Sequence, residues 1–137
     1  MSEKNLTINN TNGPLSPLRM SHIVFNKINF ERFDFCQPGD EIQFQASKEI
    51  EKIDEGHYRI SLNVIAEKKQ EYTAEVNISG YCEVPEDHPS KECLIQKNAI
   101  AILFPYLRSE LTLLTSQPET HPIVLPIVNI NAMFGDK

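Results

Sequence analysis

The sequence has little of what most catalytic and metal-binding motifs need: no tryptophan, only five glycines and only three cysteines. The glycines are scattered, so neither a phosphate-binding loop nor a dinucleotide fingerprint is present. Three cysteines without a CxxC pair favour neither a disulfide framework nor a zinc finger, and they fit a reducing compartment. No segment reaches the roughly 18 consecutive apolar residues that span a bilayer. We therefore expect a cytoplasmic protein without membrane insertion.

Length and charge narrow the class further. The chain has 137 residues, of which 40% are hydrophobic, and this suits one globular domain. Nineteen acidic against thirteen basic residues give a net charge of −6, which argues against nucleic acid and favours basic partners or simple solubility. Residues 1–20 are rich in Asn, Thr, Ser and Pro and are expected to form a flexible arm. Residues 21–137 are expected to form a single domain.

Four segments alternate between apolar and polar residues with period two, which predicts strands over 22–32, 41–51, 57–68 and 71–84. The third segment is typical, with an apolar row made of Tyr58, Ile60, Leu62, Val64 and Ala66. The first segment is less regular, because Val24, Ile28 and Phe30 share one side while Ile23 and Phe25 fall on the polar side. Strands with one apolar and one polar face predict an antiparallel sheet that is covered on one face only.

The segment 91–117 supplies the cover, because its apolar residues recur at helical spacing: Ile100, Leu103, Phe104, Leu107, Leu111 and Leu114. Pro105 is expected to kink or split this helix, since it lacks an amide donor. Ile102 and Leu113 lie off the main stripe, which predicts association into a homo-dimer or homo-tetramer. Residues 121–137 are expected to be extended, with at most one helical turn. The fold class predicted is α+β, a four-stranded antiparallel sheet backed by one long C-terminal helix.

Catalysis and metal binding find no support in the sequence. Cys82, His88 and Cys93 lie close together in the sequence, but the spacing C-x5-H-x4-C matches no standard zinc site. The alternation of the fourth strand also places Cys82 on the apolar side that faces the core. There is no nucleophile elbow, and nineteen carboxylates single out no acid–base pair. We therefore expect no enzyme, no catalytic residues, no metal and no cofactor.

The alternation of side chains along the strands places most of the excess acidic residues on the outer face of the sheet. Eight outward carboxylates stand against Lys27 and Arg59: Glu31, Glu41, Glu49, Glu51, Glu67, Glu71, Glu75 and Glu83. Such a face is either an ordinary solvated surface or a docking surface for a basic partner, whose complex salt would weaken.

A second candidate surface is apolar and lies outside the strands that build the core. Its residues follow the first strand or lie near the C-terminus: Phe33, Phe35, Ile127, Val128, Met133 and Phe134. They either seal the edges of the core or line an open groove. A groove lined by aromatic and Met side chains would suit extended, non-native polypeptides.

Two linked motifs, NAIAILFPYLR at 98–108 and LPIVNINAMF at 125–134, together with INFE at 28–31, resemble the SecB family. The resemblance spans roughly residues 21–134. It implies a dimer of dimers that binds non-native polypeptides without ATP for protein export. It also implies delivery to the motor SecA, whose zinc-binding tail docks on the acidic sheet face. By the resemblance, two docking positions fall on Glu31 and Glu75, while a third, usually acidic, is Lys27.

The sequence departs from the family pattern in two further places. It stops at residues 135–137, where SecB proteins continue into a second helix and an acidic tail, and the connection 32–40 is shorter and lacks a tryptophan. We therefore expect a divergent, C-terminally shortened SecB-like chaperone of non-native polypeptides, with a SecA-type motor as a further partner. The alternative is an adaptor of the same fold that binds one folded basic partner through its acidic face.

Overall fold

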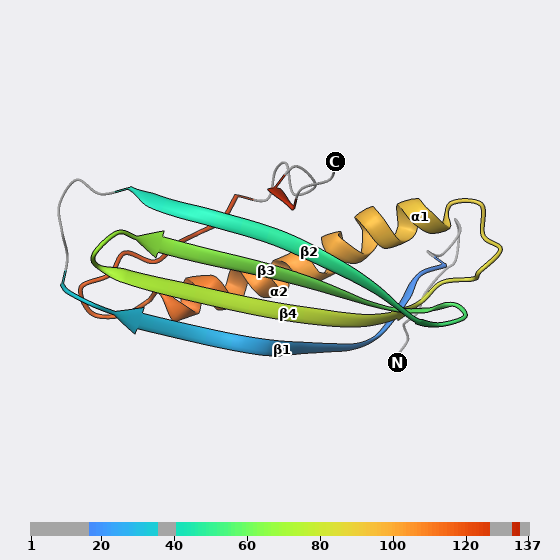
Figure 1. The fold of residues 1–137 in the computed structure, drawn as a ribbon, viewed down its shortest axis with the longest axis horizontal. Helices are drawn as coiled ribbons and strands as arrows, with labels where there is room; N and C mark the ends of the chain where they lie inside the picture. Colours follow the sequence, from blue (N-terminus) through green and yellow to red (C-terminus); the bar gives the residue numbers. More distant parts are fainter. Residues whose placement is uncertain (1–16, 36–40, 127–132, 135–137) are drawn as a thin grey trace, which may run out of the picture.

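The computed structural model describes residues 17–35, 41–126 and 133–134. Its elements follow in the order β1 (Arg19–Arg32), β2 (Ile42–Asp54), β3 (His57–Lys68), β4 (Tyr72–Glu83), α1 (Lys91–Cys93), a π-helical turn η2 (Leu94–Asn98) and α2 (Ala99–Leu114). The strands form one antiparallel sheet in the order β1-β4-β3-β2 (Figure 1). The predicted α+β architecture is confirmed. Residues 1–16 of the arm expected at 1–20 lie outside the described residues. The last part of that range is not an arm, because β1 already begins at Arg19.

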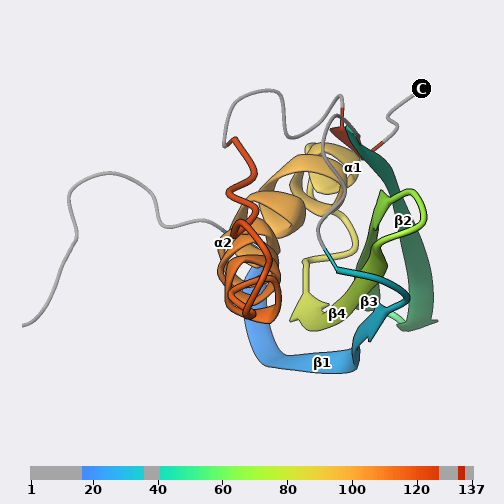
Figure 2. The same ribbon diagram turned by 90° about the vertical axis from the view of Figure 1, so that its left-hand side faces the viewer.

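The core lies between the sheet and α2, which covers one face (Figure 2). The predicted apolar rows of β3 and β4 are buried, as are Ile100, Leu103, Phe104, Leu107 and Leu111 of α2. Burying each such side chain contributes about 1.5–3 kcal/mol, so this stripe is the main source of stability. At Gly80 the helix approaches the sheet so closely that a Cβ would lie 2.8 Å from Leu103 Cδ2. Met20 Sδ would lie 2.7 Å from the same Cβ, so any larger residue requires the Leu103 and Met20 side chains to move.

Pro105 does not split the helix. The expected helix over 91–117 is instead made of α1, η2 and α2 in direct succession, and α2 runs through Pro105 without a break. Pro105 and Ala101 are both exposed, so the Ala101 carbonyl, which has no amide partner at position 105, lies on the solvent side. The irregular turn lies earlier, where η2 carries two buried residues, Leu94 and Ile95.

The prediction of which side chains of β1 face the helix is wrong for the first part of the strand. The strand shifts register against β4 between Met20 and His22 and again between Phe25 and Lys27. Each bulge inserts one residue and moves the following side chains to the opposite face. As a result Ile23 and Phe25 lie opposite Gly80 and Ile78 on the helix side, in one row with Ile28 and Phe30, while Val24 lies opposite Ser79 on the outer face.

The segment 121–126 returns along α2. Thr112 Oγ1 donates a hydrogen bond to the Ile123 carbonyl at 2.6 Å, and Arg108 Nε donates to the Leu125 carbonyl at 2.5 Å. The Ile123 amide donates to Thr115 Oγ1 at 2.9 Å. Ile123 and Leu125 are buried while Val124 is exposed, and this alternation fits the extended chain that the sequence predicts.

Candidate polypeptide-binding and docking surfaces

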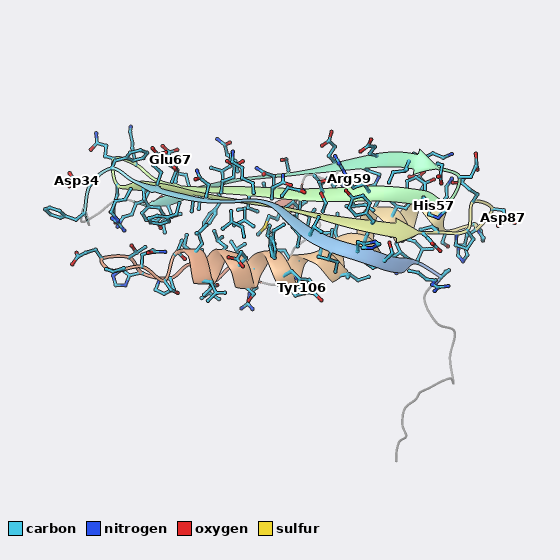
Figure 3. The ribbon with its side chains drawn as sticks, turned by 90° about the horizontal axis from the view of Figure 1, so that it is seen from below. Asp34, His57, Arg59, Glu67, Asp87 and Tyr106 are labelled. Atoms are coloured by element: carbon cyan, nitrogen blue, oxygen red, sulfur yellow. The ribbon has the colours of Figure 1, made fainter. Side chains whose placement is uncertain are left out.

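Phe33 and Phe35 follow β1 directly and are 58% and 67% exposed. The backbone that carries them is nevertheless held by hydrogen bonds. The amides of Phe33 and Asp34 donate to the Glu71 carbonyl at 2.8 and 3.3 Å, and the Phe35 amide donates to Asp34 Oδ1 at 2.8 Å. Figure 3 shows Asp34 at the extreme end of the sheet. The two aromatic side chains are therefore exposed on an ordered segment.

Glu71, which the sequence places on the outer acidic face, is buried, and that prediction is wrong. It lies in the turn between β3 and β4, where Gln70 adopts a positive φ of 66°. Its side chain is 1% exposed and forms ion pairs with Lys68 Nζ at 3.0 Å and Arg32 Nη1 at 3.5 Å. Glu71 lies in the turn and not in a strand, so the alternation of strand side chains does not decide which way it points.

The C-terminal members of the predicted apolar surface lie elsewhere. Phe134 is buried against Phe104, with ring centroids 6.2 Å apart in an edge-to-face arrangement, so its assignment to an open binding surface is corrected. Met133 is partly buried on the core. Ile127 and Val128 lie outside the described residues. Figure 1 shows residues 133–134 far along the long axis from the end of β1, so Phe33 and Phe35 form a separate surface.

Further apolar side chains are exposed on β1 and on α2. Phe25 and Ile28 are exposed on the helix side of β1, and Ile102, Tyr106 and Leu113 are exposed on α2. Tyr106 lies on the side of α2 away from the sheet (Figure 3). The sequence indicated Ile102 and Leu113 through their positions off the main stripe. Phe25 was missed because the β1 bulges cannot be read from alternation alone.

The outer face of the sheet is less uniformly acidic than predicted. Glu31 is exposed, but Glu75 pairs with Lys27 Nζ at 3.1 Å. The centre of the face is an uncharged network in which Asn26 Nδ2 donates to Asn77 Oδ1 at 2.7 Å and to Ser79 Oγ at 2.6 Å. Lys27 therefore offsets the charge of Glu75, one of the two carboxylates that the sequence resemblance indicates for docking.

Cys82 lies on β4 and is buried in the core. Burial raises the pKa of the Cys82 thiol to about 11, so this side chain stays protonated and unreactive in the core. Within residues 17–35, 41–126 and 133–134, no group of three or more His, Cys, Asp or Glu side chains is arranged to hold a metal ion. No helix in the same described ranges has the length and apolarity needed to cross a membrane.

Comparison with known proteins agrees with the fold. The family model described as preprotein translocase subunit SecB matches residues 23–137. The chain belongs to the SecB family. The protein-export protein SecB of Saccharophagus degradans is 29% identical over 92 residues, which cover 63% of this chain and 55% of that protein. An uncharacterized protein of Methanocaldococcus jannaschii is 23% identical over 133 residues, covering 90% of this chain and 86% of that protein.

The SecB fold is also seen in a solved structure, the SecB-like chaperone of Mycobacterium tuberculosis in complex with a ChAD peptide from the HigA1 antitoxin. It superposes with a TM-score of 0.66 at 11% sequence identity, covering 82% of this chain and 88% of that one. Membership of the SecB family, together with this shared fold, supports a chaperone-type role for the chain, in a family that is not enzymatic.

Proposed function

We propose that this SecB-family chain is an ATP-independent chaperone that binds non-native polypeptides, with Phe33 and Phe35 as its main contacts. The observation that carries the proposal is the exposure of both aromatic rings on a hydrogen-bonded backbone. Covering one such ring removes apolar surface from water and contributes about 1.5–3 kcal/mol, whatever the partner sequence. Aromatic contacts of this kind favour exposed apolar segments in general. The antitoxin peptide bound by the mycobacterial neighbour supports a polypeptide as the ligand class.

The test compares Phe33→Ser/Phe35→Ser with wild-type protein and with Ile53→Ser. Ile53 is 51% exposed and lies near the hairpin between β2 and β3, at the opposite end of the sheet. Each protein is added, without ATP, to a chemically denatured model protein that is diluted from denaturant, and aggregation is followed by light scattering. Binding of a labelled, permanently unfolded polypeptide is measured in parallel.

Wild type and Ile53→Ser are expected to slow aggregation equally, while the double variant loses most of this activity. The affinity of the double variant for the unfolded polypeptide is expected to fall by roughly tenfold or more, since two ring contacts are removed. A wild-type protein that neither slows aggregation nor binds the polypeptide would remove the proposal. Equal losses in both variants would remove Phe33 and Phe35 from it.

A second proposal concerns partners. We propose that the chain forms homo-dimers or homo-tetramers in the cytoplasm through the apolar surface on β1 and α2, where Phe25, Ile28, Ile102, Tyr106 and Leu113 are exposed. Association would take these side chains out of water. A monomer in sedimentation velocity at micromolar concentration would contradict it.

The adaptor function and a SecA-type motor would both use the outer face. The exposed carboxylates Glu31, Glu49 and Glu67 favour a basic partner there, whereas the Lys27–Glu75 pair weakens the field. The variant Glu31→Lys/Glu75→Lys is expected to abolish a salt-sensitive complex with a basic partner while leaving suppression of aggregation intact. A salt-sensitive complex with one folded basic partner that this variant loses, from a wild-type protein that neither suppresses aggregation nor binds the unfolded polypeptide, would favour the adaptor and reject the chaperone.

A further inference from the structure

A cluster of charged side chains around the buried Glu71 lies at the end of the sheet where Phe33 and Phe35 are exposed. Glu71 is its centre, with its carboxylate paired to Lys68 and Arg32 and its side chain 1% exposed. The backbone carbonyl of the same residue accepts the amides of Phe33 and Asp34. One residue therefore contributes both a charge and a main-chain acceptor to the segment that carries the aromatic pair.

Arg32 extends the cluster to three parts of the chain. Its guanidinium lies 5.6 Å from the ring centroids of both Phe30 and Tyr72, which stack on each other at 5.1 Å. Nη1 donates to the Asp34 carbonyl at 2.8 Å, and Nη2 donates to Thr120 Oγ1. The same guanidinium thus contacts the segment after β1, the buried Glu71 and the connection that follows α2.

The backbone at the two turns supports the same geometry. Gln70 and Glu119 adopt φ angles of 66° and 64°, a left-handed conformation that non-glycine residues rarely take. Such conformations persist when surrounding contacts determine them. Here the turn at Gln70 directs Glu71 inward, and the turn at Glu119 lies beside the Thr120 hydroxyl that Arg32 contacts.

A buried ion pair is weak evidence for stability, because apolar residues of the same volume often serve equally well. Its geometric consequence is clearer. The cluster satisfies the amides of Phe33 and Asp34 and the Asp34 carbonyl, while the two aromatic rings stay exposed. A binding surface whose backbone is already ordered loses less conformational entropy when a partner arrives, and so binds more tightly.

We propose that Glu71 is a positioning residue of the polypeptide-binding surface, which acts through its own carbonyl and through Arg32 to hold Phe33 and Phe35 in a binding-ready arrangement. The proposal rests on the proposed chaperone function. Through Arg32 and Thr120 it also connects this surface to the segment after α2.

The test compares Glu71→Gln with Glu86→Gln. Glu86 provides a matched control, because it is also a carboxylate with several donors, Gly56 N at 2.8 Å, Tyr58 OH at 2.9 Å and Lys91 Nζ at 3.0 Å, at the opposite end of the sheet. Hydrogen exchange of the Phe33 and Asp34 amides is followed by NMR. The Kd for a labelled, permanently unfolded polypeptide is measured for each variant at a temperature the same number of degrees below its Tm.

In Glu71→Gln, exchange at Phe33 and Asp34 is expected to accelerate several-fold while β4 amides are unchanged, and Kd is expected to rise on the order of tenfold. In Glu86→Gln neither quantity should change. Unchanged exchange at Phe33 and Asp34 in Glu71→Gln, or equal effects in the two variants, would overturn the positioning role.

If Glu71→Gln does not fold, Arg32→Lys serves with the same readouts, because lysine keeps the charge but cannot contact Glu71, Asp34 and Thr120 together. It is expected to accelerate exchange at Phe33 and Asp34, and protection equal to wild type would overturn the proposal. A wild-type protein that binds no polypeptide rejects the proposed function, whereas the exchange comparison still decides whether Glu71 orders the segment.

Discussion

The two edge strands of the sheet differ on the side that faces the helix. Along β1 this row is apolar from Ile23 through Phe25 and Ile28 to Phe30. Along β2 the corresponding row contains two cations, since Lys48 lies opposite Leu62 and Lys52 opposite Tyr58. Edge strands expose unpaired backbone groups, and inward-pointing charges are a common protection against unwanted strand pairing. The β2 edge carries that protection and the β1 edge does not.

The difference indicates a division of roles. Lys48 Nζ donates to Gln96 Oε1 of η2 at 2.8 Å, and Lys52 Nζ lies 3.7 Å from Glu86 in the connection between β4 and α1, so both cations have partners outside the sheet. Between Ile23 and Phe30 the helix side of β1 carries no charge, and Ile28 is 46% exposed there. The self-association proposed above would therefore use the β1 edge and leave β2 solvated.

The largest expected effect comes from placing a charge on the unprotected edge. Ile28→Lys should weaken self-association at least about a hundredfold, because an unpaired charge in an apolar interface costs several kcal/mol. Phe44→Lys is the matched control, since Phe44 is also 46% exposed and lies on the helix side of β2. Sedimentation velocity across a concentration series measures both. Dissociation of Phe44→Lys alone would reverse the assignment of the edges.

A smaller effect is expected from removing the protection of β2. Lys48→Leu leaves the row apolar from Ile42 to Ile50 and should promote new, concentration-dependent association on the order of tenfold. Light scattering at increasing protein concentration measures it, with Lys69→Leu, in the turn between β3 and β4, as a control for loss of charge alone. Equal behaviour of the two variants would show that Lys48 has no protective role.

The smallest effect concerns the anchor of the β2 hairpin. Hydrogen bonds from Gly56, Lys91 and Tyr58 lower the pKa of Glu86 from 4.5 to about 2. A lowered folded-state pKa stabilises the fold fully above pH 4.5, and this contribution is lost as the pH falls toward 2. Glu86→Gln should remove that part of the pH dependence of the urea midpoint. The same slope in wild type and variant would show that Glu86 does not anchor the hairpin.

Alternation predicted β3 and β4 well because both strands have a neighbour on each side and one fully covered face. Every residue of the predicted β3 row, from Tyr58 to Ala66, is buried. The edge strand β1 was harder, because two bulges moved Ile23 and Phe25 to the helix side and period two does not reveal a bulge. The route of α2 through Pro105 depends on which side of the helix faces solvent, a tertiary property.

The candidate site was predictable in part. The exposure of Phe33 and Phe35 fits the surface predicted for them, and their role as contacts stays a prediction. Phe134 belongs to the core, because it is buried and its ring packs on Phe104 of α2. The burial of Glu71 could not be found from the sequence, since its partners are Lys68 at the end of β3 and Arg32 at the end of β1, which is distant in the sequence.

The most direct test of the central claim is an NMR titration of the protein with a permanently unfolded polypeptide in the absence of ATP. The account predicts that the largest amide shift changes occur at residues 33–35 and that the hairpin at 54–57, at the other end of the sheet, stays unchanged. Shift changes confined to the outer face around Glu31 and Glu75, or no changes at any polypeptide concentration, would contradict it.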